Sequence, residues 1–305
     1  MATNYRVKGH YRRRGVMRFS HYPFSAMGSP CELQFYAENE VVAQKVAQKI
    51  ISDIKRLECK YSRYRSDSFL SKINQVAALG GSLSIDEETA GLLNYAQTCY
   101  ALSDGLFDIT SGILRQAWQF DTLVLPDDKI IQSLLKKIGW QKLQVENSIL
   151  SFLQAEMELD FGGIVKEYAA DRASILCLNA GILHGIINLG GDIKIIGAHP
   201  DGKPWRVGIQ HPRDKTKIWK VVKLKRGALA SSGDYERCMV IDGVRYGHIL
   251  NPKTGYPVRH LAAVSVVADL CVVAGSAATI AILKEKEGEK WLKSLGLQNY
   301  TFPQF

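Results

Sequence analysis

Helix-type and strand-type patterns of apolar residues follow one another irregularly along this chain. Apolar residues recur at helical spacing over residues 41–57, and Asp86 is placed to cap a second helix that runs to about Leu102. Another helix is predicted from residue 126 to Gly139, and two more close the chain. The predicted strands cover residues 20–37 with an interruption at 26–29, 141–153 as a hairpin, 204–210, 218–225, 228–234, 237–241, 244–249 and 262–268. Because strands and helices do not alternate regularly, the pattern favours an α+β fold.

The connections between these elements carry typical turn residues. A polar loop is predicted to follow the first helix from Tyr61 through Ser68, ending in Leu70 and Asn74. Between two of the later strands, residues 242–243 (Asp-Gly) are a strong signal for a two-residue hairpin turn.

Residues 159–197 contain a strand end, a glycine turn, a helix, a second glycine turn and a strand. The first glycine pair, residues 162–163, is followed at once by a helix that stops at Gly181. The second pair is Gly190 and Gly191. The apolar residues that predict the buried face of the helix are Ile164, Tyr168, Ala169, Ile175, Leu176 and Leu178.

The two glycine pairs suit a site for a phosphate or a pyrophosphate. Adjacent glycines permit positive φ and allow a ligand to approach the bare backbone. A helix N-terminus offers unpaired N–H groups, and Lys166 in the first turn would add a full positive charge. A tight connection between elements explains the glycines equally well, and the dinucleotide fingerprint G-x-G-x-x-G is absent.

The composition is that of an ordinary globular chain. Its 305 residues are 46% hydrophobic and 23% charged, which suffices for a large core in one domain or in two closely packed ones. The net charge of +9 is concentrated at the start, because residues 1–16 carry five positive charges and no acidic residue. We expect residues 1–19 to be a disordered, solvated basic arm, with Met17 as an alternative start, and we expect no nucleic-acid partner.

The cysteines and the apolar stretches bear on the compartment. Six cysteines are scattered without metal-binding spacing, which indicates mostly buried thiols. No apolar stretch reaches the length of a membrane span, and no signal peptide or lipoprotein cysteine precedes the fold. We therefore expect a cytoplasmic protein without a membrane span, and a periplasmic location stays open.

Eight short motifs add a resemblance to this reading. In chain order they are MGSPCELQFY, SRYRSDSFLSKIN, SDGLFDITSGIL, LDFGGIVKEYAADR, INLGGDI, PWRVGIQHP, SSGDYER and HILNPKTGYPV. Together they resemble the ApbE family of FAD:protein FMN transferases over roughly residues 22–296. The resemblance implies one domain at residues 20–298, with mixed β-sheets, flanking helices and an FAD cleft between two closely packed subdomains, followed by a short tail at 299–305.

The resemblance also implies a reaction. FAD would be the substrate, bound near Mg²⁺, and a Ser or Thr hydroxyl of a partner flavoprotein would attack its pyrophosphate. FMN would become linked to the partner through a phosphoester, and AMP would leave. Two alternatives stay open: an FAD pyrophosphatase that uses water and releases FMN and AMP, and an FAD-binding protein without catalysis.

The resemblance assigns residues to each part of FAD. The flavin and ribityl end falls to Met27, Tyr64, Leu106, Phe107, Asp108 and Thr110. The nucleotide and phosphate side falls to Asp160, Lys166, Asp171, Gly190, Gly191 and Asp192. The cleft is completed by Ser232, Gly233, Asp234, Tyr235 and Ile249. His248, as acid–base residue, and Lys166 are the candidate catalytic residues.

Several of these assignments have a structural alternative. Met27 and Phe107 also suit a hydrophobic core, and Asp108 with Thr110 suits a turn cap. A histidine flanked by Gly247 and Ile249 is often simply packed. The joint occurrence of the motifs is what favours the functional interpretation.

The metal site is where the sequence departs from the resemblance. The resemblance implies Mg²⁺ ligands at the carbonyl of Gly163 and at Thr279, together with an Asp four residues before that threonine. Here Gly275 replaces that Asp, and Glu167 stands where the family usually has Gly. Mg²⁺ usually takes a carboxylate ligand, and Asp269 is too far upstream of Gly275 to substitute simply. Gly275→Asp is therefore expected to tighten Mg²⁺ binding, unless glycine is needed there for close helix packing.

Overall fold

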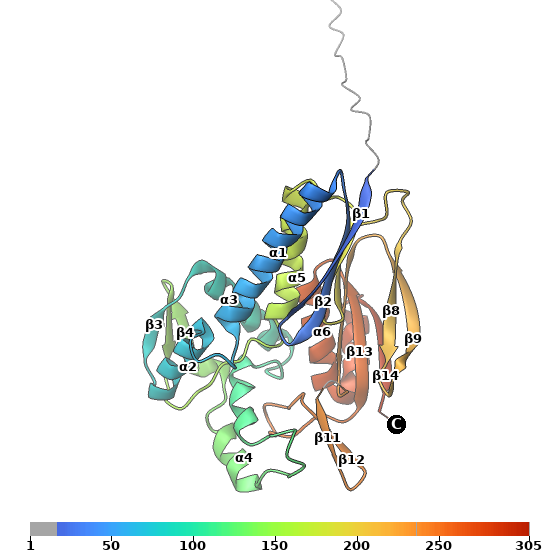
Figure 1. The fold of residues 1–305 in the computed structure, drawn as a ribbon. Helices are drawn as coiled ribbons and strands as arrows, with labels where there is room; N and C mark the ends of the chain where they lie inside the picture. Colours follow the sequence, from blue (N-terminus) through green and yellow to red (C-terminus); the bar gives the residue numbers. More distant parts are fainter. Residues whose placement is uncertain (1–16, 236, 305) are drawn as a thin grey trace, which may run out of the picture.

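A seven-stranded antiparallel sheet forms the centre of the computed structural model, which describes residues 17–235 and 237–304 (Figure 1). Every neighbouring pair in it is antiparallel. In spatial order its strands are β1 (Arg18–Ala26), β2 (Ser29–Ala37), β6 (Gly185–Leu189), β7 (Asp192–Gly197), β10 (Gly227–Gly233), β13 (Leu261–Ala268) and β14 (Gln298–Pro303). Most of the predicted basic arm lies outside the described residues, and its last two positions belong to β1.

Helices cover one face of this sheet, and a β-hairpin covers the other. Helices α5 (Val165–Asn179) and α6 (Cys271–Leu283) pack on the sheet, α5 on β7 and α6 on β10 and β13. Helix α1 (Glu40–Tyr61) packs on α5 and β1 (Figure 1). The hairpin of β8 (Trp205–His211) and β9 (Asp214–Leu224) closes a separate apolar cluster on the opposite face.

Strand β7 shows how the two faces differ. Successive side chains of a strand point to opposite faces. Ile193 and Ile195 pack in the hairpin cluster with Trp205. Asp192 and Lys194 are buried on the helix face, where each forms an ion pair with a residue of α5. The helix face of the main sheet is therefore charged at its centre.

The remaining elements form a second sheet, a hairpin and short helices (Figure 1). Strands β3 (Ser82–Ser84), β5 (Ile149–Phe152) and β4 (Leu143–Glu146) pair in that order. The others are α2 (Phe69–Leu79), α3 (Glu87–Leu102), α4 (Asp128–Leu135), α7 (Gly288–Ser294), the 3₁₀ helices Ile109–Gln116, Trp140–Lys142 and Glu285–Glu287, and the hairpin of β11 (Cys238–Ile241) and β12 (Val244–Gly247). In the described part of the chain, no helix is both long and apolar enough to cross a membrane.

Local sequence signals predicted many of these elements correctly. The α+β class is confirmed, and so is the cap of α3, because the Asp86 side chain accepts a hydrogen bond of 2.9 Å from the main-chain N–H of Thr89. The hairpin of β11 and β12 turns at Asp242 and Gly243, both with positive φ, at 50° and 77°. These features depend on neighbours in sequence, so a linear pattern suffices to find them.

Two predicted boundaries are wrong. The loop expected to extend to Asn74 ends earlier, because the Ser68 side chain caps α2 by accepting a hydrogen bond of 2.9 Å from the N–H of Ser71. The expected tail at residues 299–305 is also not separate from the domain. Gln298–Pro303 pairs with β13 as the edge strand β14.

The predicted buried face of α5 is correct only in part, because Ile164 and Ala169 are buried as expected but others are not. Ile175 and Leu178 are 55% and 46% exposed. The buried face instead carries small residues together with Glu167 and Asp171. Helix α5 is enclosed by α1, α6 and β7, so small side chains allow close packing. Lys194 lies within that packing and pairs with Asp171, which lets an acidic residue remain inside.

Candidate active site around the two glycine turns

The second glycine pair forms a tight turn between β6 and β7. Gly190 and Gly191 have φ of 61° and 95°, in the region that favours glycine. A Cβ atom on Gly190 would lie only 2.7 Å from Cβ of Ser29, in the strand after the β1–β2 turn. The fold therefore needs glycine at position 190, whether or not a ligand approaches it. Gly191 is exposed, and no described atom lies within 4 Å of the place where its Cβ would be.

The first glycine pair leads into α5. The Asp160 side chain accepts a hydrogen bond of 2.8 Å from the N–H of Gly162, which is exposed. Gly163 lies against the ring of Phe107, and a Cβ atom there would lie 3.2 Å from Cζ of that ring. The helix begins after Ile164, whose side chain makes no capping hydrogen bond. The N–H groups of Ile164 and Val165 donate to the carbonyl of Phe161 at 2.9 and 3.1 Å, and the N–H groups that follow in the first turn of α5 are the ones suited to an anion.

Lys166 places a positive charge beside both turns. Its Nζ lies 2.8 Å from Oδ2 of Asp192, and Asp192 is only 2% exposed while the Lys166 side chain is 28% exposed. Its Cδ would lie 3.9 Å from a Cβ atom on Gly190. Burial acts to lower the pKa of Lys166, but the charges of Asp192 and Glu167 and the hydrogen bond to Asp192 together outweigh it and raise that pKa. Lys166 is therefore a charged side chain with a partly open face next to the Gly190 turn.

Asp171, assigned to the cofactor by the resemblance, is engaged within the fold. Its Oδ1 and Oδ2 accept hydrogen bonds of 2.9 and 3.0 Å from the N–H groups of Cys271 and Val272, which cap α6. Nζ of Lys194 lies 3.0 Å from Oδ1. Both carboxylate oxygens thus bind groups of the protein, and the visible role of Asp171 is to fix α6 against α5.

A chain of polar contacts links the β11–β12 hairpin to the first glycine pair. Arg237 donates a hydrogen bond of 2.5 Å to the hydroxyl of Tyr64, and Arg63 donates another of 2.9 Å. Arg63 also pairs with Asp160. Partial burial acts to raise the pKa of the Tyr64 hydroxyl, but the hydrogen bonds from Arg237 and Arg63 lower it overall, although the side chain is largely exposed. Sequence reasoning missed both arginines, and the only signal was their position inside two of the motifs.

The other residues assigned to the flavin end lie mostly inside the protein. The carboxylate of Asp108 accepts hydrogen bonds from the N–H and hydroxyl of Thr110, at 2.9 and 2.7 Å, and burial raises its pKa. Thr110 is fully buried, so the turn-cap alternative describes this pair. Met27 has a φ of 53°, and its N–H donates to the Glu58 side chain at 2.6 Å. Residues that are partly buried against the main core are Met27, Leu106 and Ile249.

His248 lies at the exposed end of β12. Its N–H donates a hydrogen bond of 3.0 Å to the carbonyl of Arg237, and its Nδ1 lies 3.3 Å from the same oxygen. The chain of contacts through Arg237 and Tyr64 therefore connects His248 to the side of the first glycine pair. The structure thus brings the candidate acid–base residue into one network with Asp160.

The residues assigned to the C-terminal side of the cleft are held by close contacts. Arg213 donates hydrogen bonds of 2.5 and 2.9 Å to the two carboxylate oxygens of Asp234. A Cβ atom on Gly233 would lie 2.2 Å from the Tyr235 ring, so only glycine fits there. The hydroxyls of Ser232 and Thr279 lie 2.8 Å apart. Asp234 is thus tied to Arg213 in the β8–β9 turn, and the Tyr235 ring lies against Gly233 at the end of β10.

Glu167 and Gly275, the two residues at which this chain departs from the family motifs, lie against each other. A Cβ atom on Gly275 would lie 2.6 Å from Cγ of Glu167. Glu167 is buried, and its Oε2 makes no hydrogen bond within the described residues. Burial, followed by the negative charge of Asp192, raises the pKa of Glu167.

The donor set here is of the oxygen type that Mg²⁺ prefers. Within residues 17–235 and 237–304, no three His, Cys, Asp or Glu side chains are grouped to hold a metal ion. A cation at this place would therefore also need hydroxyl or main-chain oxygens. The hydroxyl of Thr279 fits that requirement, and the unbonded carboxyl oxygen of Glu167 would be the charged ligand beside it.

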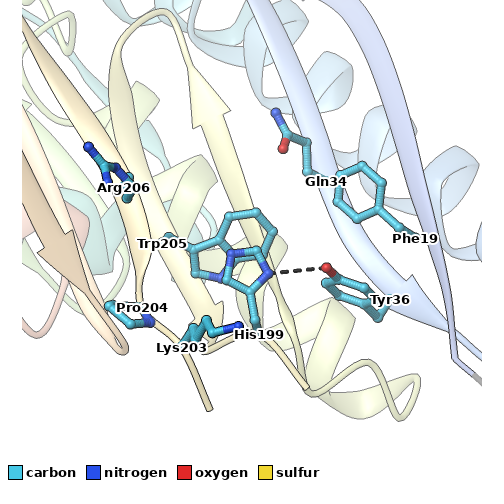
Figure 2. A pocket seen from close by; sticks show the side chains of 8 residues that line it. All are labelled: Phe19, Gln34, Tyr36, His199, Lys203, Pro204, Trp205 and Arg206. Carbon is cyan, nitrogen blue, oxygen red and sulfur yellow. Dashed lines mark hydrogen bonds between the residues drawn. The ribbon is translucent and has the colours of Figure 1, made fainter. Parts of the chain in front are cut away.

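A hollow of about 490 Å³ lies away from these residues, between the β1–β2 edge of the sheet and β8 (Figure 2). The rings of His199 and Trp205 stack with centroids 3.8 Å apart, and Nδ1 of His199 lies 3.1 Å from the Tyr36 hydroxyl. None of the residues predicted for the FAD site lines this hollow.

Comparisons with known proteins agree with the motifs. The model of the ApbE family matches residues 27–301. FAD:protein FMN transferases of Vibrio cholerae and Escherichia coli are 28% and 29% identical, over 86% and 84% of this chain and 80% and 76% of theirs. The ApbE protein of Thermotoga maritima is 30% identical, with a TM-score of 0.86 over 94% of this chain and 95% of that one. A flavinyl transferase ApbE of Pseudomonas stutzeri, in its apo form, is 26% identical, with a TM-score of 0.83 over 93% and 91%. This chain, with its two glycine turns and its Lys166–Asp192 pair, is therefore a member of the ApbE family.

Proposed function

We propose that this protein is an FAD:protein FMN transferase that modifies a Ser or Thr of a partner flavoprotein. The relatives named above carry this activity in their names. One observation supports it most: Lys166 lies between the open N-terminus of α5 and the Gly190 turn, where a pyrophosphate can bind.

The reaction is a displacement at phosphorus. The hydroxyl oxygen of the acceptor attacks the phosphorus on the riboflavin side of FAD and forms a new phosphoester. The bond between that phosphorus and the bridging oxygen breaks, and AMP leaves with the electron pair. Such a step depends mainly on positioning and on stabilising the charge of the phosphate oxygens. Lys166 and the N–H groups of α5 supply that stabilisation.

Two residues outside α5 would accept the hydroxyl proton of the acceptor and contact the flavin. His248 takes the hydroxyl proton of the acceptor, since it is exposed and within the network that reaches Asp160. Tyr64 offers an exposed aromatic ring for the flavin end. Mg²⁺ would neutralise pyrophosphate charge, with Thr279 and the carbonyl of Gly163 among its ligands.

Release of AMP from FAD distinguishes this proposal from its alternatives. The protein is incubated with FAD and Mg²⁺, alone, with a candidate acceptor flavoprotein, and with the same acceptor after its target Thr is replaced by Val. Transfer predicts AMP and a fluorescent flavin on the denatured acceptor only with the intact Thr. AMP without any acceptor would identify a pyrophosphatase. With the acceptor of a related FMN transferase, no AMP in any mixture would support a binding protein without catalysis.

A further inference from the structure

We propose that Glu167 of α5 supplies the carboxylate ligand of a divalent cation site that Gly275 of α6 leaves room for. Compared with the family motifs, the two positions would have exchanged roles. The carboxylate would come from Glu167 on α5, and Gly275 on α6 would provide the space for it. The inference depends on the proposed function only for the identity of the cation as Mg²⁺.

The first argument is steric. A Cβ atom on Gly275 would lie 2.6 Å from Cγ of Glu167 and 3.0 Å from both Cδ and Oε1. A contact of 2.6 Å is essentially never seen for a real Cβ atom, so a side chain at position 275 requires Glu167 to leave its present position. The Glu167 carboxyl therefore occupies the place that a side chain on Gly275 would enter.

The second argument is the lack of a dedicated partner for Glu167. The residue is only 7% exposed, and its Oε2 makes no hydrogen bond to any described residue. The nearby ammonium group of Lys166 is paired with Asp192 at 2.8 Å. Asp192 adds a second negative charge that acts on Glu167. The charge of Lys166 acts on Glu167 too, so the two buried carboxylates of Glu167 and Asp192 share it. Buried negative charge that is not fully balanced is destabilising, and a divalent cation would balance it.

The third argument is the set of oxygens nearby. Thr279 lies four residues after Gly275, on the same face of α6. Its hydroxyl is 2.8 Å from that of Ser232 on β10. Mg²⁺ is typically held by one or two carboxylates, with water and substrate phosphates as further ligands. Glu167, Asp192 and Thr279 offer such a set without a cage of protein ligands.

Binding of Mn²⁺, a spectroscopic substitute for Mg²⁺, tests the inference without any turnover. Electron paramagnetic resonance would follow Mn²⁺ titrations of the whole chain, alone and with ADP, which carries a pyrophosphate but no flavin to transfer. Glu167→Gln keeps the volume and removes the charge, so we expect the affinity for Mn²⁺ to fall at least about tenfold. Equal affinity of the wild type and Glu167→Gln, or no Mn²⁺ binding by the wild type with ADP, would overturn the proposal.

A pair of exchanged residues provides the matched control. Gly275→Asp alone should lower the melting temperature and should not strengthen Mn²⁺ binding, because the new side chain collides with Glu167. Glu167→Gly with Gly275→Asp moves the carboxylate to the other helix, and it should restore both stability and Mn²⁺ binding. Tighter Mn²⁺ binding by Gly275→Asp alone would instead show that Glu167 is not the ligand.

Different results would contradict the cation site at Glu167 and the proposed FMN transfer. Binding of Mn²⁺ that depends on Glu167, in a protein that releases no AMP from FAD even with the acceptor, would leave this inference standing and would overturn the proposed function. Release of AMP that depends on the acceptor, with Mn²⁺ binding unaffected by Glu167→Gln, would do the reverse.

Discussion

Nζ of Lys166 lies 2.8 Å from Oδ2 of Asp192, in an ion pair that joins the first turn of α5 to the first residue of β7. Asp192 also accepts a hydrogen bond of 3.2 Å from the N–H of Ser231, so its carboxylate connects α5, β7 and β10. The lysine that we assign to the pyrophosphate therefore also neutralises a buried charge. A substitution at Lys166 is therefore expected to change both the affinity for FAD and the stability of the fold.

Lys166→Ala is expected to lower the free energy of unfolding by roughly 3 kcal/mol, because it leaves the Asp192 carboxylate buried without its partner. Lys166→Ala combined with Asp192→Asn should recover most of that stability but not the affinity for FAD. Urea unfolding and calorimetric titration with FAD measure the two effects. If the double variant binds FAD as tightly as the wild type, Lys166 serves the fold alone.

Asp171→Asn is expected to destabilise the protein by about 2 kcal/mol while leaving the FAD affinity of the folded protein unchanged. The change removes the charge that pairs with Lys194 and one of the two acceptors that cap α6. Thermal unfolding and FAD titration check it, with Asp201→Asn, in an exposed pair with Lys203, as the control without effect. A large loss of FAD affinity at full stability would restore Asp171 to the cofactor site.

His248→Ala is expected to reduce the rate of FMN transfer about 100-fold with little change in the dissociation constant of FAD, since proton transfer contributes to the rate and not to binding. The comparison uses His260→Ala, because His260 is also exposed but belongs to no predicted motif. Single-turnover rates and FAD titration measure the two quantities. Parallel losses in rate and affinity would make His248 a binding residue.

The ion pairs that hold α1 and α3 together should make stability depend on pH. Arg56 donates hydrogen bonds of 2.8 and 2.9 Å to Glu88, and these hold the pKa of Glu88 down at about 2 against the opposing effect of burial. Because the folded pKa lies below the unfolded value of 4.5, this stabilisation is present above about pH 4.5 and is lost as the pH falls through about 2.

Glu88→Gln should therefore destabilise the protein by about 1 kcal/mol near neutral pH, a value reduced by solvent screening. The difference from the wild type should shrink as the pH is lowered towards about 3. Thermal unfolding of both proteins across this range measures it. A difference that stays constant with pH would mean that Glu88 stabilises by packing and not by charge.

Features of this protein that depend on residues nearby in sequence were predictable, and features that depend on packing between distant elements were not. The turns at Gly190, Gly191 and Asp242, and the cap at Asp86, were predictable because each depends on φ or on a hydrogen bond a few residues away. The motifs, read in order, likewise indicated the family. The amino-acid sequence by itself determined these local features and the presence of Lys166 in the first turn of α5, where we propose that phosphate binds.

Only the tertiary structure decided what lies next to what. Asp171 meets the N-terminus of a helix that begins at Cys271, and the Arg63 and Arg237 guanidinium groups meet at one tyrosine hydroxyl. The small residues of α5 turn inward because three other elements enclose that face. Glu167 and Gly275 appear in the sequence as two unrelated exceptions. They become one feature only when α5 and α6 pack, because a glycine on one helix is what leaves space for the carboxylate of the other.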